Sequence, residues 1–183
     1  WWILLIAFLH VACVFFSSYV TMLKSRQEAY MAYSNPRLIK ALRKTYETLK
    51  TSPLYSWGHL GACNCGHLAQ AVTRQSAHDI HQAALRRAGD WGEVVVEYCP
   101  QSLLPVDHIL TQLYDLGLTA RDIEHFEDLS DPQILAELVA PGIYLTRNDK
   151  NHVMLYIEGW ISVLERDLFQ REKVASEPLL KVG

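Results

Sequence analysis

Residues 61–70 read Gly-Ala-Cys-Asn-Cys-Gly-His-Leu-Ala-Gln, and no other ten residues of the chain concentrate as much reactive chemistry. Two of the four cysteines and one of the eight histidines lie here. Cys63, Cys65 and His67 alternate, so in an extended loop their side chains would point to one side. Because zinc and iron favour thiolate and imidazole ligands, the motif predicts a metal site, with structural zinc ahead of iron.

A C-x-C-x-H motif supplies only three ligands, so a tetrahedral site needs a fourth donor from elsewhere in the chain. The candidates for that position are Cys99, His59, His81 and His108. A plain packing role is the competing interpretation, because free cysteine behaves as a small buried hydrophobe and glycine suits a tight loop. The sequence leaves both interpretations open.

Cys65 alone suggests a second chemistry. The pattern predicts a helix over 66–74, which places Cys65 at a helix N-terminus, where the helix dipole stabilises a thiolate. A histidine could then act as its base in a thiol-dependent enzyme. The chain lacks the strands of papain-type proteases, and it contains no P-loop, dinucleotide-binding fingerprint, catalytic-triad motif or H-E-x-x-H motif.

Charge is distributed unevenly along the 183 residues, whose net charge is −3. Residues 24–50 carry seven basic and two acidic side chains, whereas residues 51–139 carry four basic and twelve acidic ones. The segment 107–139 has the outline of a helix-turn-helix, but its eight acidic side chains and one basic side chain argue against nucleic acid. A third hypothesis is therefore a non-catalytic interaction module that presents an acidic face to a basic protein partner.

Residues 1–23 are nearly all apolar, and no charged residue precedes Lys24. About 20 such residues suffice to span a bilayer, so a transmembrane helix is one expectation. Residues 24–36 would then form a basic linker on the cytoplasmic side, against anionic headgroups. The alternative is that residues 1–30 do not belong to the mature protein, that Met31 is the start, and that the domain is cytoplasmic. An odd number of cysteines after residue 23 fits a reducing compartment.

The remaining sequence predicts an all-α domain over residues 37–171, a bundle of six to eight mostly short helices closed by a long one, with a flexible tail at 172–183. Asn35-Pro36, Ser76, Asp90, Pro105, Thr119 and Asp131 each have the chemistry of a helix start. With apolar residues at helical spacing, they predict helices over 36–50, 66–74, 77–87, 91–99, 105–114, 120–129, 132–139 and 149–171.

The stretch 61–70, with its approach Tyr55-x-Trp57-Gly58-His59, resembles segments of small bacterial proteins of uncharacterised function. The similarity runs from about residue 31 to about residue 168. It implies a stand-alone helical domain and says nothing about activity, so no functional residue is carried over from it.

Overall fold

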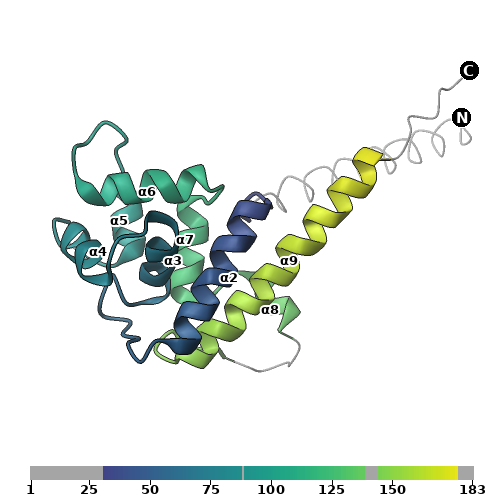
Figure 1. Ribbon diagram of the computed structural model, residues 1–183, viewed down its shortest axis with the longest axis horizontal. Coiled ribbons are helices and arrows are strands. Elements are labelled where there is room, and N and C mark those ends of the chain that lie inside the picture. The colour runs from purple at the N-terminus through teal and green to yellow at the C-terminus, as the bar shows by residue number, and fades with distance from the viewer. Residues whose placement is uncertain (1–30, 88, 139–143, 177–183) are drawn as a thin grey trace, which may run out of the picture. The chain divides into compact units, whose positions relative to one another are not determined.

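A computed structural model of the chain describes residues 31–87, 89–138 and 144–176. These residues form eight helices and no strand, which confirms the predicted all-α fold class (Figure 1). The helices are α2 (Pro36–Thr51), α3 (Asn64–Thr73), α4 (Ala77–Ala84), α5 (Trp91–Val96), α6 (Pro105–Asp115), α7 (Ala120–Asp128), α8 (Pro132–Glu137) and α9 (Lys150–Ser176).

Local capping chemistry sets where the helices begin, as predicted. The Asn35 carboxamide oxygen accepts from the Leu38 N–H at 3.0 Å, and Pro36 opens α2. Thr119 and Asp122 form a reciprocal capping box at α7. Each such cap satisfies backbone N–H groups that have no partner inside the helix. The side chains of Ser76, Asp90 and Asp131 cap α4, α5 and α8 in the same way.

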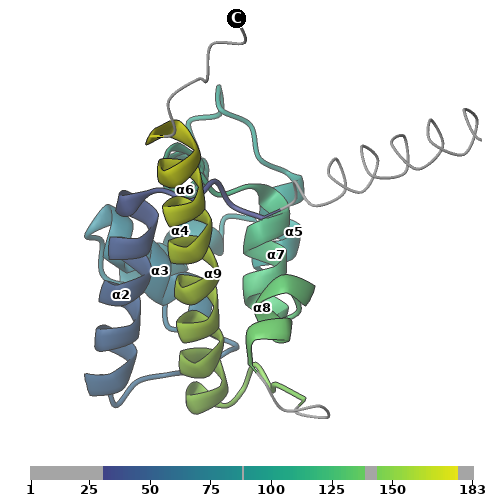
Figure 2. The ribbon, with the colours of Figure 1, turned by 90° about the vertical axis from the view of Figure 1, so that its right-hand side faces the viewer.

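Helix α3 lies at the centre of the helical domain. It contacts α2, α4, α6 and α7, and every residue from 61 to 69 is buried. Helices α2 and α9 run side by side, while α5 packs on α7 and α8 on α9 (Figures 1 and 2). Rings from α5, α7 and α9 fill much of the core, with Trp91, Phe126, Tyr156 and Trp160 all fully buried.

Several predicted boundaries need correction. Helix α5 ends at Val96 rather than at residue 99, and α9 continues to Ser176 into the predicted tail. Residues 32–35 are packed rather than part of a linker: the Ala32 N–H donates to the Asp122 carboxylate at 2.7 Å, and the Tyr33 N–H donates to the Gly117 carbonyl at 3.1 Å. The folded domain therefore begins a few residues before its first helix.

The predicted transmembrane helix over 1–23, most of the basic linker and the end of the tail lie outside the described residues. Within the described ranges, no helix combines the length and the apolar character that a membrane span requires.

Candidate functional site

The first turn of α3 determines how the C-x-C-x-H motif is displayed. Cys63 is the N-cap residue, whose Sγ accepts from the Gly66 N–H at 3.3 Å, and the helix begins at Asn64 instead of Gly66. Successive helical residues are rotated by about 100°, so Cys65 and His67 point to nearly opposite sides of α3. The expectation of an extended loop with three donors on one side is therefore wrong.

The three motif side chains have separate surroundings. The Cys63 thiol donates to the Leu60 carbonyl, and the Cys65 thiol donates to the Ile123 carbonyl, each at 3.6 Å. His67 places its Nε2 3.2 Å from the carbonyl oxygen of Leu54. Across residues 31–87, 89–138 and 144–176, no three His, Cys, Asp or Glu side chains are grouped so that they could hold a metal ion. The zinc or iron site stays a prediction that this geometry does not support.

The four candidates for the fourth ligand position fall into two groups. Cys99 is exposed in the loop after α5 with its thiol directed to the Gln101 side chain, and His108 is exposed on α6. His59 and His81 come together instead, with their rings stacked 3.9 Å apart between centroids. The structure thus pairs two of the predicted donors with each other, and no third donor among the described residues completes a metal site with them.

Cys65 occupies the predicted position in the first turn of α3, but its surroundings oppose a thiolate. The side chain is 2 % exposed and lies among apolar residues of α3, α6, α7 and α9. Burial, and after it the nearby carboxylate of Glu127, raises the pKa of this thiol well above its ordinary value. This environment favours the protonated thiol rather than the thiolate that a nucleophile needs, and the thiol-enzyme hypothesis stays a prediction.

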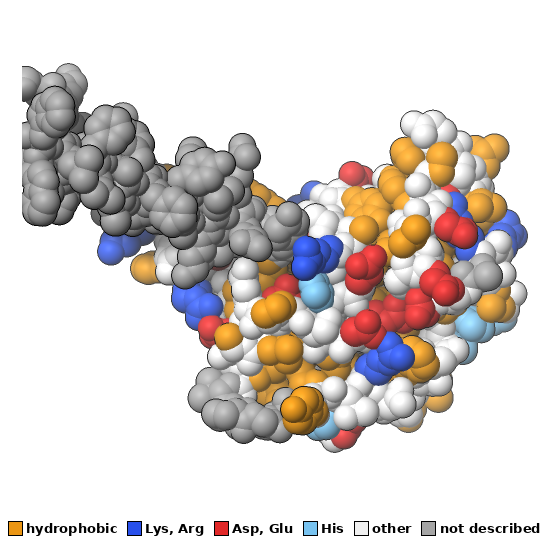
Figure 3. Space-filling model, turned by 180° about the vertical axis from the view of Figure 1, so that it is seen from behind, with side chains coloured by type: hydrophobic (Ala, Val, Ile, Leu, Met, Phe, Trp, Pro, Cys, Tyr) orange, Lys and Arg blue, Asp and Glu red, His pale blue; other side chains and the backbone are white. Residues whose placement is uncertain are grey.

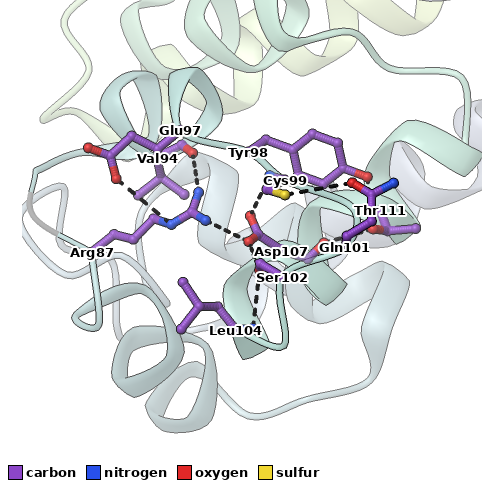
Figure 4. Close-up of polar contacts among 10 residues, drawn as sticks. All are labelled: Arg87, Val94, Glu97, Tyr98, Cys99, Gln101, Ser102, Leu104, Asp107 and Thr111. Carbon is purple, nitrogen blue, oxygen red and sulfur yellow. Dashed lines mark hydrogen bonds and ion pairs between the residues drawn. The ribbon is translucent and has the colours of Figure 1, made fainter.

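A buried ion pair that the sequence did not reveal fixes the loop between α5 and α6 (Figure 4). Arg87 donates to the Asp107 carboxylate at 2.5 Å, and both side chains are almost wholly buried. Asp107 also accepts from the Ser102 hydroxyl and from the Cys99 N–H. These bonds compensate the desolvation of the two charges, and they tie the loop to α6. We assign this cluster a structural role.

Acidic side chains gather on the face that Figure 3 shows. Helices α5 and α7 pack together, and a Cβ atom on Gly92 of α5 would have the side chains of Asp90, Glu124 and Glu127 within 4 Å. The acidic interaction face itself stays a prediction from the charge distribution. Its basic partner remains a prediction.

A cavity of about 500 Å³ lies between the end of α2, the loop 52–62, helix α3 and the start of α4. We call it the histidine pocket, because His59, His67 and His78 all line it. Hydroxyl and amide groups complete its polar lining, and small or apolar side chains form the remainder. The polar group comprises Thr48, Ser52, Tyr55, Ser56 and Gln70, and the apolar group comprises Pro53, Leu54, Ala62 and Ala77.

Backbone contacts hold the walls of the histidine pocket in place. A Cβ atom on Gly61 would lie 1.8 Å from the Ala77 carbonyl oxygen, so only glycine lets the loop approach α4 this closely. Gln70 donates to the Gly61 carbonyl at 2.8 Å, and Lys150 donates to the Ser52 carbonyl at 3.1 Å. The Tyr55 hydroxyl donates to the Arg147 carbonyl. The pocket is therefore built by the fold and does not depend on a ligand to form.

The surroundings of two histidines in and beside the pocket, His67 and His81, lower their pKa values. Burial, and after it the charge of Lys150, lowers the pKa of His67, while the hydrogen bond to Leu54 acts in the opposite direction. Burial also lowers the pKa of His81, and the neighbouring rings of His59 and His78 add to this effect. Perturbed titratable groups beside a cavity are a common mark of binding sites.

The sequence held one signal for this pocket that the motif analysis did not use. Four of the eight histidines fall between residues 59 and 81, yet no fixed spacing links them to each other or to Thr48 and Tyr55.

A scan against protein-family models and searches of curated proteins and of solved structures find no match to this chain. The resemblance to small bacterial proteins therefore stays an expectation.

Proposed function

We propose that this domain binds a small molecule in the histidine pocket. The observation that carries the proposal is the cavity itself: its volume of about 500 Å³ lies within the roughly 300–1,000 Å³ typical of ligand sites. Apolar walls with a few polar side chains at defined positions are the usual composition of such sites. The histidine pocket follows this pattern, with aliphatic groups from the loop 52–62 and imidazoles from three separate segments.

The architecture supports binding in a second way. The pocket is lined by His67 and Gln70 of α3, a helix that contacts α2, α4, α6 and α7, and by a loop that is hydrogen-bonded near both ends. Preformed walls reduce the ordering cost that a ligand would otherwise have to offset. A rigid, histidine-lined cavity is therefore better suited to holding a ligand than to simple packing.

A fragment screen by two-dimensional amide NMR on the full chain tests the proposal. We expect hits that shift the amides of residues 54–56, 67–70 and 77–78 together. Ala77→Phe would place a ring in the pocket, since Ala77 lines it at the first position of α4. This variant should abolish binding of those hits.

Ala136→Phe supplies the matched control, because Ala136 is exposed on α8 and does not line the pocket. This variant should bind the same hits as the wild-type chain does. The proposal is overturned if no fragment at millimolar concentration shifts the pocket amides. It is also overturned if the hits bind the Ala77→Phe chain as well as they bind wild type.

A further inference from the structure

We propose that the ligand of the histidine pocket is a small organic anion, a carboxylate carried on a flat apolar body. This inference rests on the proposed function and names the ligand class for the same site. Three imidazoles line the cavity, a fourth stacks on one of them, and no Asp or Glu side chain is among the lining residues. No carboxylate of the lining therefore competes for these imidazoles, and a bound carboxylate would favour their protonated form.

Two kinds of hydrogen-bond donor belong to residues that line the cavity. His59 Nδ1 accepts from the Gly61 N–H at 3.2 Å, so the neutral ring carries its proton on Nε2 as a donor. Ala77 and His78 are the first two residues of α4 and line the pocket. Because the first N–H groups of a helix have no partner within the helix, they add donors and positive potential on this side.

Charged groups of both signs lie around the histidines, and Lys150 is the cation nearest to a lining imidazole that the electrostatics identify. From α9, Lys150 lies close enough to lower the pKa of His67, and its ammonium donates to the carbonyl of Ser52, a lining residue. From α2, Lys44 donates to the Ala71 carbonyl at 3.2 Å. Three nearby carboxylates oppose them. The Asp79 carboxylate accepts from the Ser76 hydroxyl at 2.7 Å, and the charges of Asp149 and Glu127 both act on Tyr55.

The remaining walls suit a flat apolar body. The rings of Tyr55 and His67 lie within 16° of parallel, with centroids 6.5 Å apart, and both line the pocket. Pro53, Leu54 and Ala62 add aliphatic surface. An aromatic carboxylate could therefore rest its rings on these walls while its charged end meets the imidazoles and the start of α4.

Three probes of the same shape and different charge test the inference on the full chain: 2-naphthoate, 2-naphthamide and 2-naphthamidine. We expect 2-naphthoate to bind several-fold more tightly than 2-naphthamide at pH 6, and 2-naphthamidine to bind most weakly. Binding of the carboxylate favours protonated histidine, and burial lowers the pKa of His67 from 6.5, so the affinity should fall as the pH rises from about 5 to about 7. The affinity of the uncharged amide should change little in that range.

His78→Gln should lower the affinity for 2-naphthoate several-fold and leave the affinity for 2-naphthamide unchanged. His78→Arg should restore the affinity for 2-naphthoate. His108→Gln, an exposed histidine on α6, serves as the control and should alter neither probe. Equal or tighter pocket binding of the amide or the amidine at pH 6 overturns the anion class and leaves the proposed function standing. The anion class is likewise overturned if other fragments occupy the pocket and 2-naphthoate does not, whereas a pocket that takes no compound at all removes both proposals.

Discussion

The environment of Glu127 differs from that of an ordinary surface carboxylate. It is 3 % exposed on α7, and its carboxylate accepts from the Gly92 N–H at 2.8 Å, at the start of α5. Burial, and after it the charge of Asp90, raises the pKa of Glu127 to about 7, while the amides of Gly92 and Trp91 act in the opposite direction. The side chain joins α7 to α5 at the cost of a partly desolvated charge.

Because the pKa of Glu127 is about 7 when folded and near 4.5 when unfolded, the folded state binds more protons between these values. The free energy of unfolding should therefore fall as the pH rises through this window, by up to about 1.4 kcal/mol per pH unit from this group, and level off above it. Glu127→Gln keeps an acceptor for the Gly92 N–H, and it should reduce the dependence of the free energy of unfolding on pH in this window. Urea unfolding of both chains from pH 4.5 to pH 8 measures the difference, and parallel curves would contradict the assignment.

The cysteines offer a direct test of the thiol hypothesis. Burial raises the pKa of Cys63 to about 12 and that of Cys65 well above its ordinary value, while Cys99 is exposed. Since the thiolate is the reactive species, iodoacetamide should modify Cys99 first and reach the other two only after unfolding. Peptide mass spectrometry after native alkylation measures this order. Modification of Cys65 as fast as Cys99 would revive the enzyme hypothesis.

At the scale of single elements, the sequence predicted correctly where most helices begin, but it did not predict how the side chains of the C-x-C-x-H motif are arranged. A cap such as Asn35 or Thr119 is decided by bonds within four residues, so local chemistry is sufficient. The direction in which Cys65 and His67 point depends instead on where α3 begins. The helix begins two residues earlier than predicted, so Cys65 and His67 lie on different sides of α3 instead of on one side of a loop. Residues 61–70 contain no conventional polar cap that would have indicated this start, because Cys63 acts as the cap.

The loop 52–62 contains two glycines, of which only Gly61 lies so close to another segment that a side chain would clash. Gly61→Ala would force a Cβ to within 1.8 Å of the Ala77 carbonyl oxygen, so α4 and the pocket wall must move apart. We expect a loss of about 1–3 kcal/mol or more in the free energy of unfolding. Gly58→Ala is the matched control, since nothing lies within 4 Å of the added atom, and it should stay within about 0.5 kcal/mol of wild type. Equal effects of the two changes would show that the approach is not tight.

For the molecule as a whole, the central position of α3 could not be read from the sequence. The long apolar stripe of α9 predicts a helix that faces the core. Helix α3 has only ten residues and includes Asn64 and Gly66, so its sequence does not indicate a central position. Gly66 belongs there because a Cβ would lie 2.4 Å from the Leu60 carbonyl oxygen, and the Asn64 carboxamide donates to two carbonyls at the end of α7. These reasons are contacts with distant segments, which neither periodicity nor propensity encodes.

If α3 is the shared support of the domain, a cavity beside it should weaken every helix that it contacts. Leu68 on α3 is 2 % exposed, so Leu68→Ala should lower the free energy of unfolding by about 2–5 kcal/mol. Hydrogen exchange should then show the amides of α2, α4, α6 and α7 losing protection together, since they would open in one cooperative step. Leu85→Ala, at a leucine that is 56 % exposed, should leave both measurements nearly unchanged. Loss of protection confined to α3 and α4 would instead mean that the histidine pocket can open while α2 stays packed on α9.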